Sequence, residues 1–318
     1  MWDMVRTGTC LILAVLAGAL AQTPPSKTTY VYKTVGGLNI ELDVYRVSSA
    51  RLRPGIFWIH GGALIGGHRT NIHPKQLARY LEAGFNVVSI DYRLAPETKL
   101  PEILSDVADA WRWVQVHGKS QAGIDPRRVA AVGHSAGGYL ALVTGYLAKP
   151  RPRAVVAFYG YGDLIADWYA KPDPFYLSRP AVPEAEARAA VGQKPLSGAP
   201  APNQRFRYYL FLRQRGLWPK EVAGVDPAEH PEAFRPWCPA SNVTREYPPT
   251  MLLHGDKDTD VPVAQSDQMA ALFKQYVVPC EYLRIAGAGH GFDGRMNDAA
   301  TAAHFERVIE FLRSRLGY

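Results

Sequence analysis

Apolar residues along this chain gather in short continuous runs that are separated by longer segments of mixed character. Three of these runs, GIFWIH, FNVVSIDYR and RRVAAVGHS, begin at Gly55, Phe85 and Arg127. Two later runs, AVVAFYG and PTMLLHG, begin at Ala154 and Pro249. Continuous apolar runs of this length are typical of strands that are buried on both faces. The pattern therefore predicts a central sheet that is covered on two sides.

The segments between these runs predict the covering helices. Apolar residues recur at helical spacing in two stretches, at Leu100, Ile103, Leu104, Val107, Trp111 and Val114 and again at Phe305, Val308, Ile309 and Leu312. Earlier in the chain, Gly36-Gly37 separates two strand-like runs, as expected of a β-hairpin. Buried strands that alternate with amphipathic helices predict an α/β fold with a mainly parallel sheet and helices on both faces.

Two interruptions of this alternation define the expected domain organisation. Residues 1–21 contain the uncharged run Cys10–Ala21, which is shorter than a membrane span and ends in an A-x-A site, as expected of a cleaved signal peptide. Residues 22–28 are expected to form a linker and residues 29–318 one domain. Within this domain, residues from about 162 to 239 are rich in Pro, Arg and aromatic side chains and too numerous for a plain connection. They predict an inserted helical cap, with a separate domain as the alternative.

Composition and charge mainly exclude functions. The 318 residues have a formal net charge of +7, but Lys and Arg are spread along the chain, so no nucleic-acid partner is expected. The signal peptide predicts a secreted or periplasmic protein without a stable membrane anchor. Beyond it, Cys238 and Cys280 are too few for a disulfide scaffold and lack metal-ligand spacing. Whether they pair stays open, as does the oligomeric state.

Candidate chemistry begins at Ser135. Residues 133–137 read Gly-His-Ser-Ala-Gly, a G-x-S-x-G pattern between the apolar run RRVAAV and the helix-like segment GYLALVTGYLA. Flanking glycines allow a strand and a helix to approach through a tight turn that exposes the serine. The helix N-terminus then directs its free N–H groups at the reacting centre. Ser135 is therefore the candidate nucleophile.

A serine hydroxyl becomes a good nucleophile only when a base removes its proton and an acid orients that base. His290 lies in the Gly-rich segment AGAGHGF after the strand-like run CEYLRIA, and it is the candidate base. Asp256, Asp258 and Asp260 follow another buried run, and each is a candidate for the acid. The order Ser, Asp, His along a chain is that of one class of hydrolases.

The reaction of such a nucleophile with a carbonyl also needs donors for the developing oxyanion. The segment WIHGGALIGG, residues 58–67, supplies glycine N–H groups just beyond a predicted strand. Because glycines carry no side chain, these N–H groups are free to approach a substrate.

Together these motifs make the chain resemble the α/β-hydrolase superfamily, in particular hormone-sensitive-lipase-like and bacterial feruloyl-esterase-like serine carboxylesterases. The resemblance runs from about Thr29 to the C-terminus, apart from most of the insert. His60-Gly61-Gly62 is similar to the family's oxyanion motif, and residues 91–97, DYRLAPE, to another family block. The family pattern H-G-x-x-D-x-x-V-P falls on residues 254–262 and selects Asp258 among the three acids.

The resemblance implies roles for individual residues. Ser135, Asp258 and His290 would form the catalytic triad, and the backbone N–H groups of Gly61, Gly62 and Ala136 would form the oxyanion hole. The DYRLAPE block, His60 and His254 would be structural. Ala63 stands where lipase-like members often have a third glycine, which puts their alcohol preference in doubt for this chain.

The predicted function is hydrolysis of short-chain or aromatic carboxylic esters, including carbohydrate-linked ones, through an acyl-enzyme. A serine peptidase, an amidase or formamidase on the same fold, and a non-catalytic binding module are the alternatives. No cofactor and no metal are expected, since His68 and His73 lack the helical spacing of metal ligands.

The insert is expected to set selectivity, because a triad and an oxyanion hole alone do not distinguish between esters. Its strand of origin ends at the same edge as Ser135, so aromatic residues of the insert are candidates for the pocket wall. These candidates are Phe175, Tyr176, Phe206, Tyr208, Tyr209 and Trp218.

Overall fold

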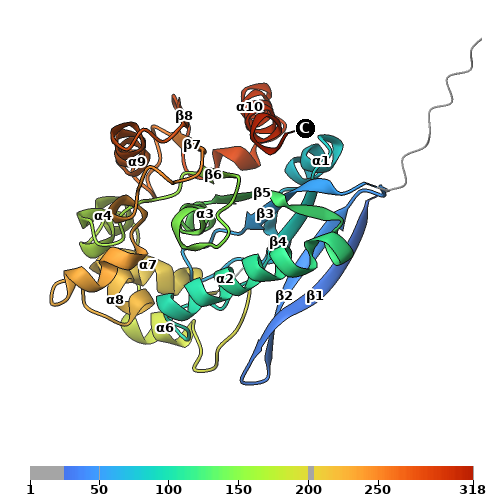
Figure 1. Cartoon of the computed structure of the whole chain (residues 1–318). Coiled ribbons are helices and arrows are strands. Elements are labelled where there is room, and N and C mark those ends of the chain that lie inside the picture. Colours follow the sequence, from blue (N-terminus) through green and yellow to red (C-terminus); the bar gives the residue numbers. More distant parts are fainter. Residues whose placement is uncertain (1–24, 50, 200–203, 318) are drawn as a thin grey trace, which may run out of the picture.

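The computed structural model describes residues 25–49, 51–199 and 204–317, and one eight-stranded sheet runs through its centre (Figure 1). In chain order the strands are β1 (Ser26–Val35), β2 (Leu38–Arg46), β3 (Arg53–Ile59), β4 (Asn86–Ile90), β5 (Ile124–His134), β6 (Ala154–Phe158), β7 (Thr250–Gly255) and β8 (Cys280–Ile285). Their order across the sheet is β1-β2-β4-β3-β5-β6-β7-β8. Strands β4, β3, β5, β6, β7 and β8, in this order across the sheet, run parallel to one another. The pairings β1·β2 and β2·β4 are antiparallel. The predicted α/β fold with a mainly parallel sheet is confirmed.

The N-terminal hairpin corrects one predicted boundary. Gly36 and Gly37 both have positive φ, at 55° and 84°, as a tight hairpin turn between β1 and β2 requires. However, β1 begins at Ser26, inside the predicted linker 22–28, and pairs with β2 from its first residue. These first residues pair with the backbone of β2, and the side chain of Lys27 also forms an ion pair with Asp43 of β2 at 2.7 Å. The predicted signal peptide, residues 1–21, lies outside the described residues.

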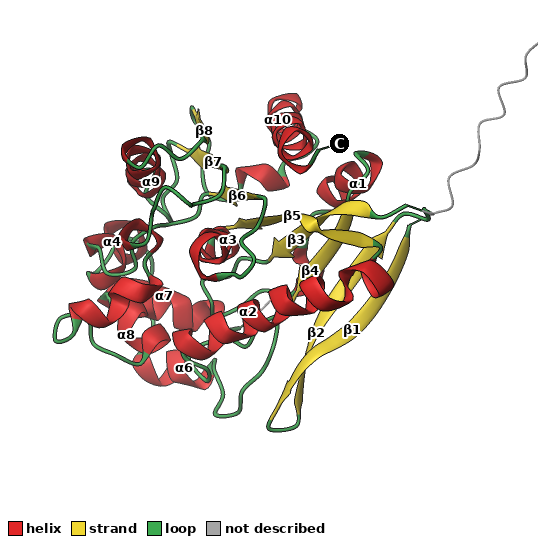
Figure 2. Cartoon of the chain, in the orientation of Figure 1, coloured by secondary structure: helices red, strands yellow, loops and turns green. Residues whose placement is uncertain are grey.

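Helices cover both faces of the sheet (Figure 2), because successive side chains of each buried strand point to opposite sides. On one face Ile56 and Trp58 of β3 pack against two helices, α1 (Pro74–Glu82) and α10 (Ala299–Leu316). On the other face Phe57 and Ile59 belong to the larger core, which contains side chains of α2 (Leu100–His117), α3 (Ala136–Leu147) and α9 (Ala264–Gln275) and of the helices between β6 and β7.

The long segment between β6 and β7 is helical where it is described. Its helices are α4 (Asp167–Ala170), α5 (Pro174–Leu177), α6 (Glu184–Ala189), α7 (Phe206–Arg215) and α8 (Trp218–Ala223), followed by the 3₁₀ helices η3 (Pro231–Trp237) and η4 (Pro239–Ser241). Figure 1 shows α6, α7 and α8 close to the beginning of α2, beyond one end of the sheet. Within the described ranges no helix is long and apolar enough to cross a bilayer. Cys238 and Cys280 are both free thiols.

The sheet also fixes where the candidate site lies. Parallel strands β3, β5, β6, β7 and β8 are neighbours, so the loops that follow them meet at one edge. Ligands of open parallel sheets bind at this carboxyl edge. Every residue that sequence analysis placed in the candidate triad or oxyanion hole follows one of these strands.

Candidate active site

Ser135 sits on a sharp turn between β5 and α3. Its backbone angles, φ 56° and ψ −125°, are unusual for a residue with a side chain and indicate local strain. Two contacts hold the turn: the N–H of Ser135 donates to the carbonyl of Phe158 at 2.9 Å, and α3 packs so close to β3 that a Cβ on Gly137 would overlap the carbonyl of Ile59. The strained turn presents the Ser135 hydroxyl to an open cavity.

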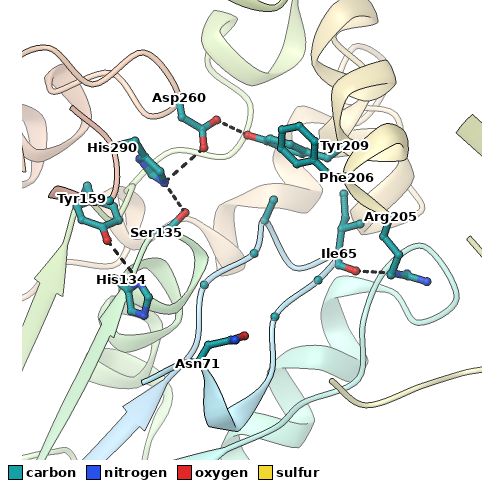
Figure 3. Close-up of a pocket in the computed structure, with 16 residues that line it drawn as sticks. Ile65, Asn71, His134, Ser135, Tyr159, Arg205, Phe206, Tyr209, Asp260 and His290 are labelled. Carbon is teal, nitrogen blue, oxygen red and sulfur yellow. Dashed lines mark hydrogen bonds and ion pairs between the residues drawn. The ribbon is translucent and has the colours of Figure 1, made fainter. Parts of the chain in front are cut away.

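A chain of hydrogen bonds links Ser135 to the two other residues of the predicted triad. His290 Nε2 lies 3.1 Å from Ser135 Oγ, and His290 Nδ1 lies 2.8 Å from Asp258 Oδ2 (Figure 3 draws the first contact). When Nδ1 carries the proton it donates to the carboxylate, and Nε2 is then free to accept the serine proton. The structure thus brings together three side chains from loops after β5, β7 and β8.

Asp258 is held in its ionised form by several donors. The backbone N–H groups of Asp260 and Val261 donate to Oδ1 at 2.8 and 2.9 Å, while Oδ2 accepts from His290 and lies 3.3 Å from Nε2 of buried His254. Although burial opposes the charge, these donors hold the pKa of Asp258 well below its usual range. At neutral pH it is therefore a carboxylate that orients His290.

The groups around His290 raise the pKa of its imidazole, whereas those around Asp258 lower the pKa of that carboxyl. Burial alone disfavours the imidazolium, but the hydrogen bond to Asp258 and the nearby charges of Asp260 and Asp293 raise the pKa of His290 above its ordinary value. The ring also packs against Tyr159, with centroids 4.5 Å apart. These surroundings therefore stabilise the protonated form of the His290 imidazole.

The glycine loop after β3 lies opposite the histidine. Gly61 and Gly62 line the same cavity as Ser135, and a Cβ on Gly61 would come within 2.8 Å of the His134 carbonyl. Ala136 is the first residue of α3, so its N–H has no acceptor within the helix. The three predicted oxyanion donors therefore flank Ser135.

Side chains beneath the loop hold it in place. Burial lowers the pKa of His60 to about 3, so its ring is neutral, and Nδ1 lies 2.7 Å from the carbonyl of Gly61. From the insert, Trp218 Nε1–H donates to the carbonyl of Ala63 at 3.0 Å, and Arg205 Nε–H donates to that of Ile65 at 2.5 Å. These contacts hold the backbone of the loop that lines the cavity.

The charged residues of the DYRLAPE block form ion pairs with three neighbouring segments. Asp91 accepts from the backbone N–H and the side chain of Arg69, and Arg93 forms a two-point contact with buried Asp106 of α2, at 2.7 and 2.8 Å. Glu97 accepts two hydrogen bonds from Arg205 of the insert, at 2.6 and 2.8 Å. None of these three residues of the block lines the cavity.

The cavity itself has a volume of about 380 Å³ and is lined mainly by apolar groups. Of the six aromatic candidates from the insert, Phe206 and Tyr209 of α7 line it (Figure 3). Tyr208 instead donates to Glu221 at 2.7 Å, and Tyr176 donates to Asp260 at 2.7 Å. The expectation that the insert contributes an aromatic wall holds for two residues of one helix.

Sequence reasoning missed Asp260 as a cavity residue. Its carboxylate lines the pocket beside His290, with Oδ2 3.4 Å from Nε2 of the imidazole (Figure 3). Asp258 and Asp260 lie in a turn after β7 and not in an extended segment, so their spacing in the sequence did not indicate that both lie beside His290. Tyr159, directly after β6, was missed as well, although its position at the carboxyl edge could have indicated it. Across the described residues no cluster of three or more His, Cys, Asp or Glu has a geometry suited to a metal ion.

Comparison with known families and proteins concerns the fold and the family of the chain. The family described as alpha/beta hydrolase fold matches residues 56–294. The esterase LipC of Mycobacterium tuberculosis is 30% identical over 281 residues, which cover 85% of this chain and 61% of LipC. A non-reducing polyketide synthase of Penicillium roqueforti is 28% identical over 92% of this chain, but the match covers only 14% of that synthase. The chain therefore spans less than two thirds of these relatives.

Solved structures share the fold at lower identity. A Staphylococcus aureus protein of unknown function superposes with a TM-score of 0.75 at 22% identity, covering 91% of this chain and 99% of that one. A thermophilic esterase of Thermogutta terrifontis with bound propionate gives a TM-score of 0.64 at 23% identity, covering 90% and 93%. At these identities the likeness concerns the fold alone.

Proposed function

Because this chain belongs to the alpha/beta hydrolase fold family, we propose that it is a serine hydrolase that cleaves carboxylic esters through an acyl-enzyme. The observation that carries the proposal is the hydrogen-bonded series Ser135–His290–Asp258 at the edge of an open cavity. The similarity to LipC, whose name describes an esterase, further supports ester bonds as the target.

The first half of the proposed reaction forms the acyl-enzyme. His290 Nε2 takes the proton of Ser135 as Oγ attacks the ester carbonyl, and Asp258 stabilises the resulting imidazolium. The N–H groups of Gly61, Gly62 and Ala136 would stabilise the oxyanion. When the carbon–oxygen bond to the alcohol breaks, Nε2–H gives its proton to the departing alcohol, and the acyl group stays on Ser135.

The second half returns the enzyme to its starting state. A water molecule takes the place of the alcohol and gives a proton to His290 Nε2 as its oxygen attacks the acyl carbonyl. Collapse of this intermediate breaks the bond to Ser135 Oγ, which recovers the proton from Nε2, and the carboxylic acid leaves. No cofactor is needed for either half.

The cavity favours small substrates. A volume of about 380 Å³ is at the lower end of small-molecule sites, and its lining is mostly apolar. We therefore propose short-chain or aromatic esters rather than long lipid esters. Phe206 and Tyr209 would contact the substrate from the insert.

The test is hydrolysis of p-nitrophenyl acetate, butyrate, octanoate and palmitate, with acetyl p-nitroanilide as the amide counterpart. We expect the highest kcat/KM for acetate or butyrate, a much lower value for the anilide, and a loss of about 10⁶ in turnover for Ser135→Ala. Retention of a tenth of the activity by Ser135→Ala would rule out this nucleophile. A faster anilide than ester would favour an amidase.

We also propose that the protein is exported and cleaved after residue 21. The apolar run Cys10–Ala21 and its A-x-A end support this proposal. N-terminal sequencing of protein from the native host is expected to begin at or near Gln22. Intact Met1 on the mature protein would contradict it.

A further inference from the structure

Asp260 is fixed far more firmly than a residue of a surface loop requires. Its Oδ1 accepts three hydrogen bonds, from Tyr176 OH at 2.7 Å, Tyr209 OH at 2.5 Å and Arg213 at 2.8 Å. Arg213 also donates to the backbone carbonyl of Asp260 at 3.0 Å. All three donors come from the insert, so the carboxylate is held between two parts of the fold.

Arg213 is itself buried and immobilised. Its side chain is 0% exposed, binds Asp173 at 2.5 Å through its other terminal nitrogen, and lies over the ring of Tyr176 at 4.6 Å. Burying a guanidinium is costly unless its charge is compensated. Asp173 and Asp260 compensate the charge of this guanidinium. Because Arg213 is held in place, its ion pair with Asp260 fixes the orientation of the Asp260 carboxylate.

In this orientation the second oxygen, Oδ2, points to the candidate active site. It lies 3.4 Å from His290 Nε2, the atom that faces Ser135 (Figure 3). When His290 is neutral, Nε2 carries a lone pair and cannot donate to Oδ2. The carboxylate then presents a strong acceptor to whatever occupies the cavity.

We propose that Asp260 Oδ2 accepts a hydrogen bond from a hydroxyl group of the substrate's alcohol, so that the enzyme selects esters of vicinal diols, the arrangement found in polyols and sugars. This inference rests on the proposed function, because it needs an ester bound at Ser135. It adds the class of alcohol and the residue that recognises it.

Geometry determines which part of the substrate meets Asp260. The departing alcohol oxygen must receive its proton from His290 Nε2 and therefore binds within hydrogen-bond distance of that atom. Since Oδ2 is 3.4 Å from Nε2, it adjoins the position of this oxygen. A hydroxyl on the carbon next to the ester-bearing carbon reaches Oδ2, whereas a hydroxyl on the acyl group lies on the far side of the carbonyl.

The donors to Oδ1 leave Oδ2 as the oxygen that can bind a substrate. Arg213, 2.8 Å from Oδ1, already pairs with this carboxylate, so Asp260 does not need a cation from the substrate. A neutral hydroxyl donates a charge-assisted hydrogen bond to Oδ2. An alkyl group in its place would leave the carboxylate desolvated without a partner.

The experiment compares esters that differ only at this position. In 2-hydroxyethyl acetate a hydroxyl replaces the terminal methyl group of propyl acetate. In the control pair, 2-methoxyethyl acetate has an ether oxygen in place of a methylene group of butyl acetate, and this oxygen can accept a hydrogen bond but cannot donate one. For the wild-type protein we expect kcat/KM to be about tenfold or more higher for the hydroxyethyl than for the propyl ester. We expect no preference for the methoxyethyl over the butyl ester.

Two variants assign the preference to Asp260. Asp260→Asn removes the charge with little change of shape, and the hydroxyethyl-to-propyl ratio is expected to fall at least threefold. A purely structural role would lower kcat/KM for both esters and leave the ratio unchanged. Asp256→Asn is the matched control, since Asp256 lies in the same loop, accepts from the N–H of Gly287 and does not line the cavity. It is expected to keep the wild-type ratio.

The outcomes are separable from those of the proposed function. If the wild-type protein hydrolyses both esters through Ser135 at equal kcat/KM, the esterase proposal stands and the diol proposal is overturned. Equal ratios in wild type and Asp260→Asn would overturn it as well. If the preference for acetylcholine over 3,3-dimethylbutyl acetate exceeds the preference for the hydroxyethyl over the propyl ester, Asp260 binds a cation and the diol proposal is overturned. The wild-type comparison needs no variant and stays decisive if Asp260→Asn does not fold.

Discussion

Two regions meet at the cavity, and they are built by different means. The loops after β3, β5, β7 and β8 are positioned by the sheet, whose strand order brings their ends together at one edge. Helix α7 of the insert is positioned by side chains, above all by the ion pairs of Arg205 with Glu97 and of Arg213 with Asp260. The first region depends on backbone geometry, and the second on buried charge.

This difference separates chemistry from recognition. The sheet-borne loops carry Ser135, His290, Asp258 and the glycines, which are the groups that the proposed reaction requires. The insert carries Phe206, Tyr209 and the donors that fix Asp260, which touch the space where a substrate would lie. We therefore expect changes in the first region, apart from Asp260, to act on all substrates alike. Changes in the second region and at Asp260, which the insert holds in place, are expected to act on the ranking of substrates.

The largest expected effect concerns the acid of the sheet-borne region. Asp258→Asn should preserve the fold but lower turnover by about 10⁴, because an amide no longer stabilises the imidazolium or fixes the tautomer of His290. Steady-state kinetics with p-nitrophenyl acetate would measure the loss. Asp256→Asn, in the same loop, should cost far less, and a larger loss there would show that the family pattern is misaligned.

The next effect is on stability and tests the junction of the two regions. Glu97 is 0% exposed at its side chain and accepts from Arg205 of the insert and from the N–H of Gly192. Glu97→Gln leaves the guanidinium without its counter-charge and is expected to lower the free energy of unfolding by about 3 kcal/mol, measured by urea denaturation. Glu184→Gln is the control, because its pair with Arg188 lies exposed on α6. Equal effects of both variants would mean that the insert is not held by this buried pair.

The sheet-borne region was largely predictable, and individual residues show why. Apolar runs identify strands because burial on both faces excludes polar residues, and the family pattern then selected Asp258 from three neighbouring acids. The structure brings it within hydrogen-bond distance of His290, as expected. The insert was not predictable in this detail. Tyr208 and Tyr209 are adjacent and chemically identical, yet only Tyr209 lines the cavity, because the helix phase is set by the buried ion pairs of Arg205 and Arg213. Such long-range pairs leave no local pattern.

A third prediction uses the pH dependence of activity to test whether the charge of Asp260 acts on His290. As the proposed base, His290 must be neutral in the free enzyme, so we expect kcat/KM to fall as the pH drops through the pKa of His290, which nearby carboxylates raise. Asp260→Asn removes one of these charges, so the pKa of His290 falls and activity persists to lower pH. The pH profile of kcat/KM for propyl acetate measures the shift. Asp256→Asn should not move the acid limb, and an unshifted limb in Asp260→Asn would show that Asp260 does not act on His290.

The smallest expected effect probes the aromatic wall of the insert. Phe206 lines the cavity but is 52% exposed, and its ring lies 6.0 Å from that of Tyr209, so truncation removes substrate contact without opening the core. Because Tyr209 donates to Asp260, this wall lies on the side where the alcohol departs. Phe206→Ala should therefore lower the kcat/KM ratio of butyl to ethyl acetate about threefold, the value of one buried methylene group, while the free energy of unfolding stays unchanged. Phe175→Ala, which trims packing within the insert outside the cavity, should leave the ratio intact. If Phe206→Ala lowers kcat/KM equally for both esters, the wall positions the triad rather than the alcohol. Helix α7 would then not act on the ranking of substrates, contrary to the comparison of the two regions.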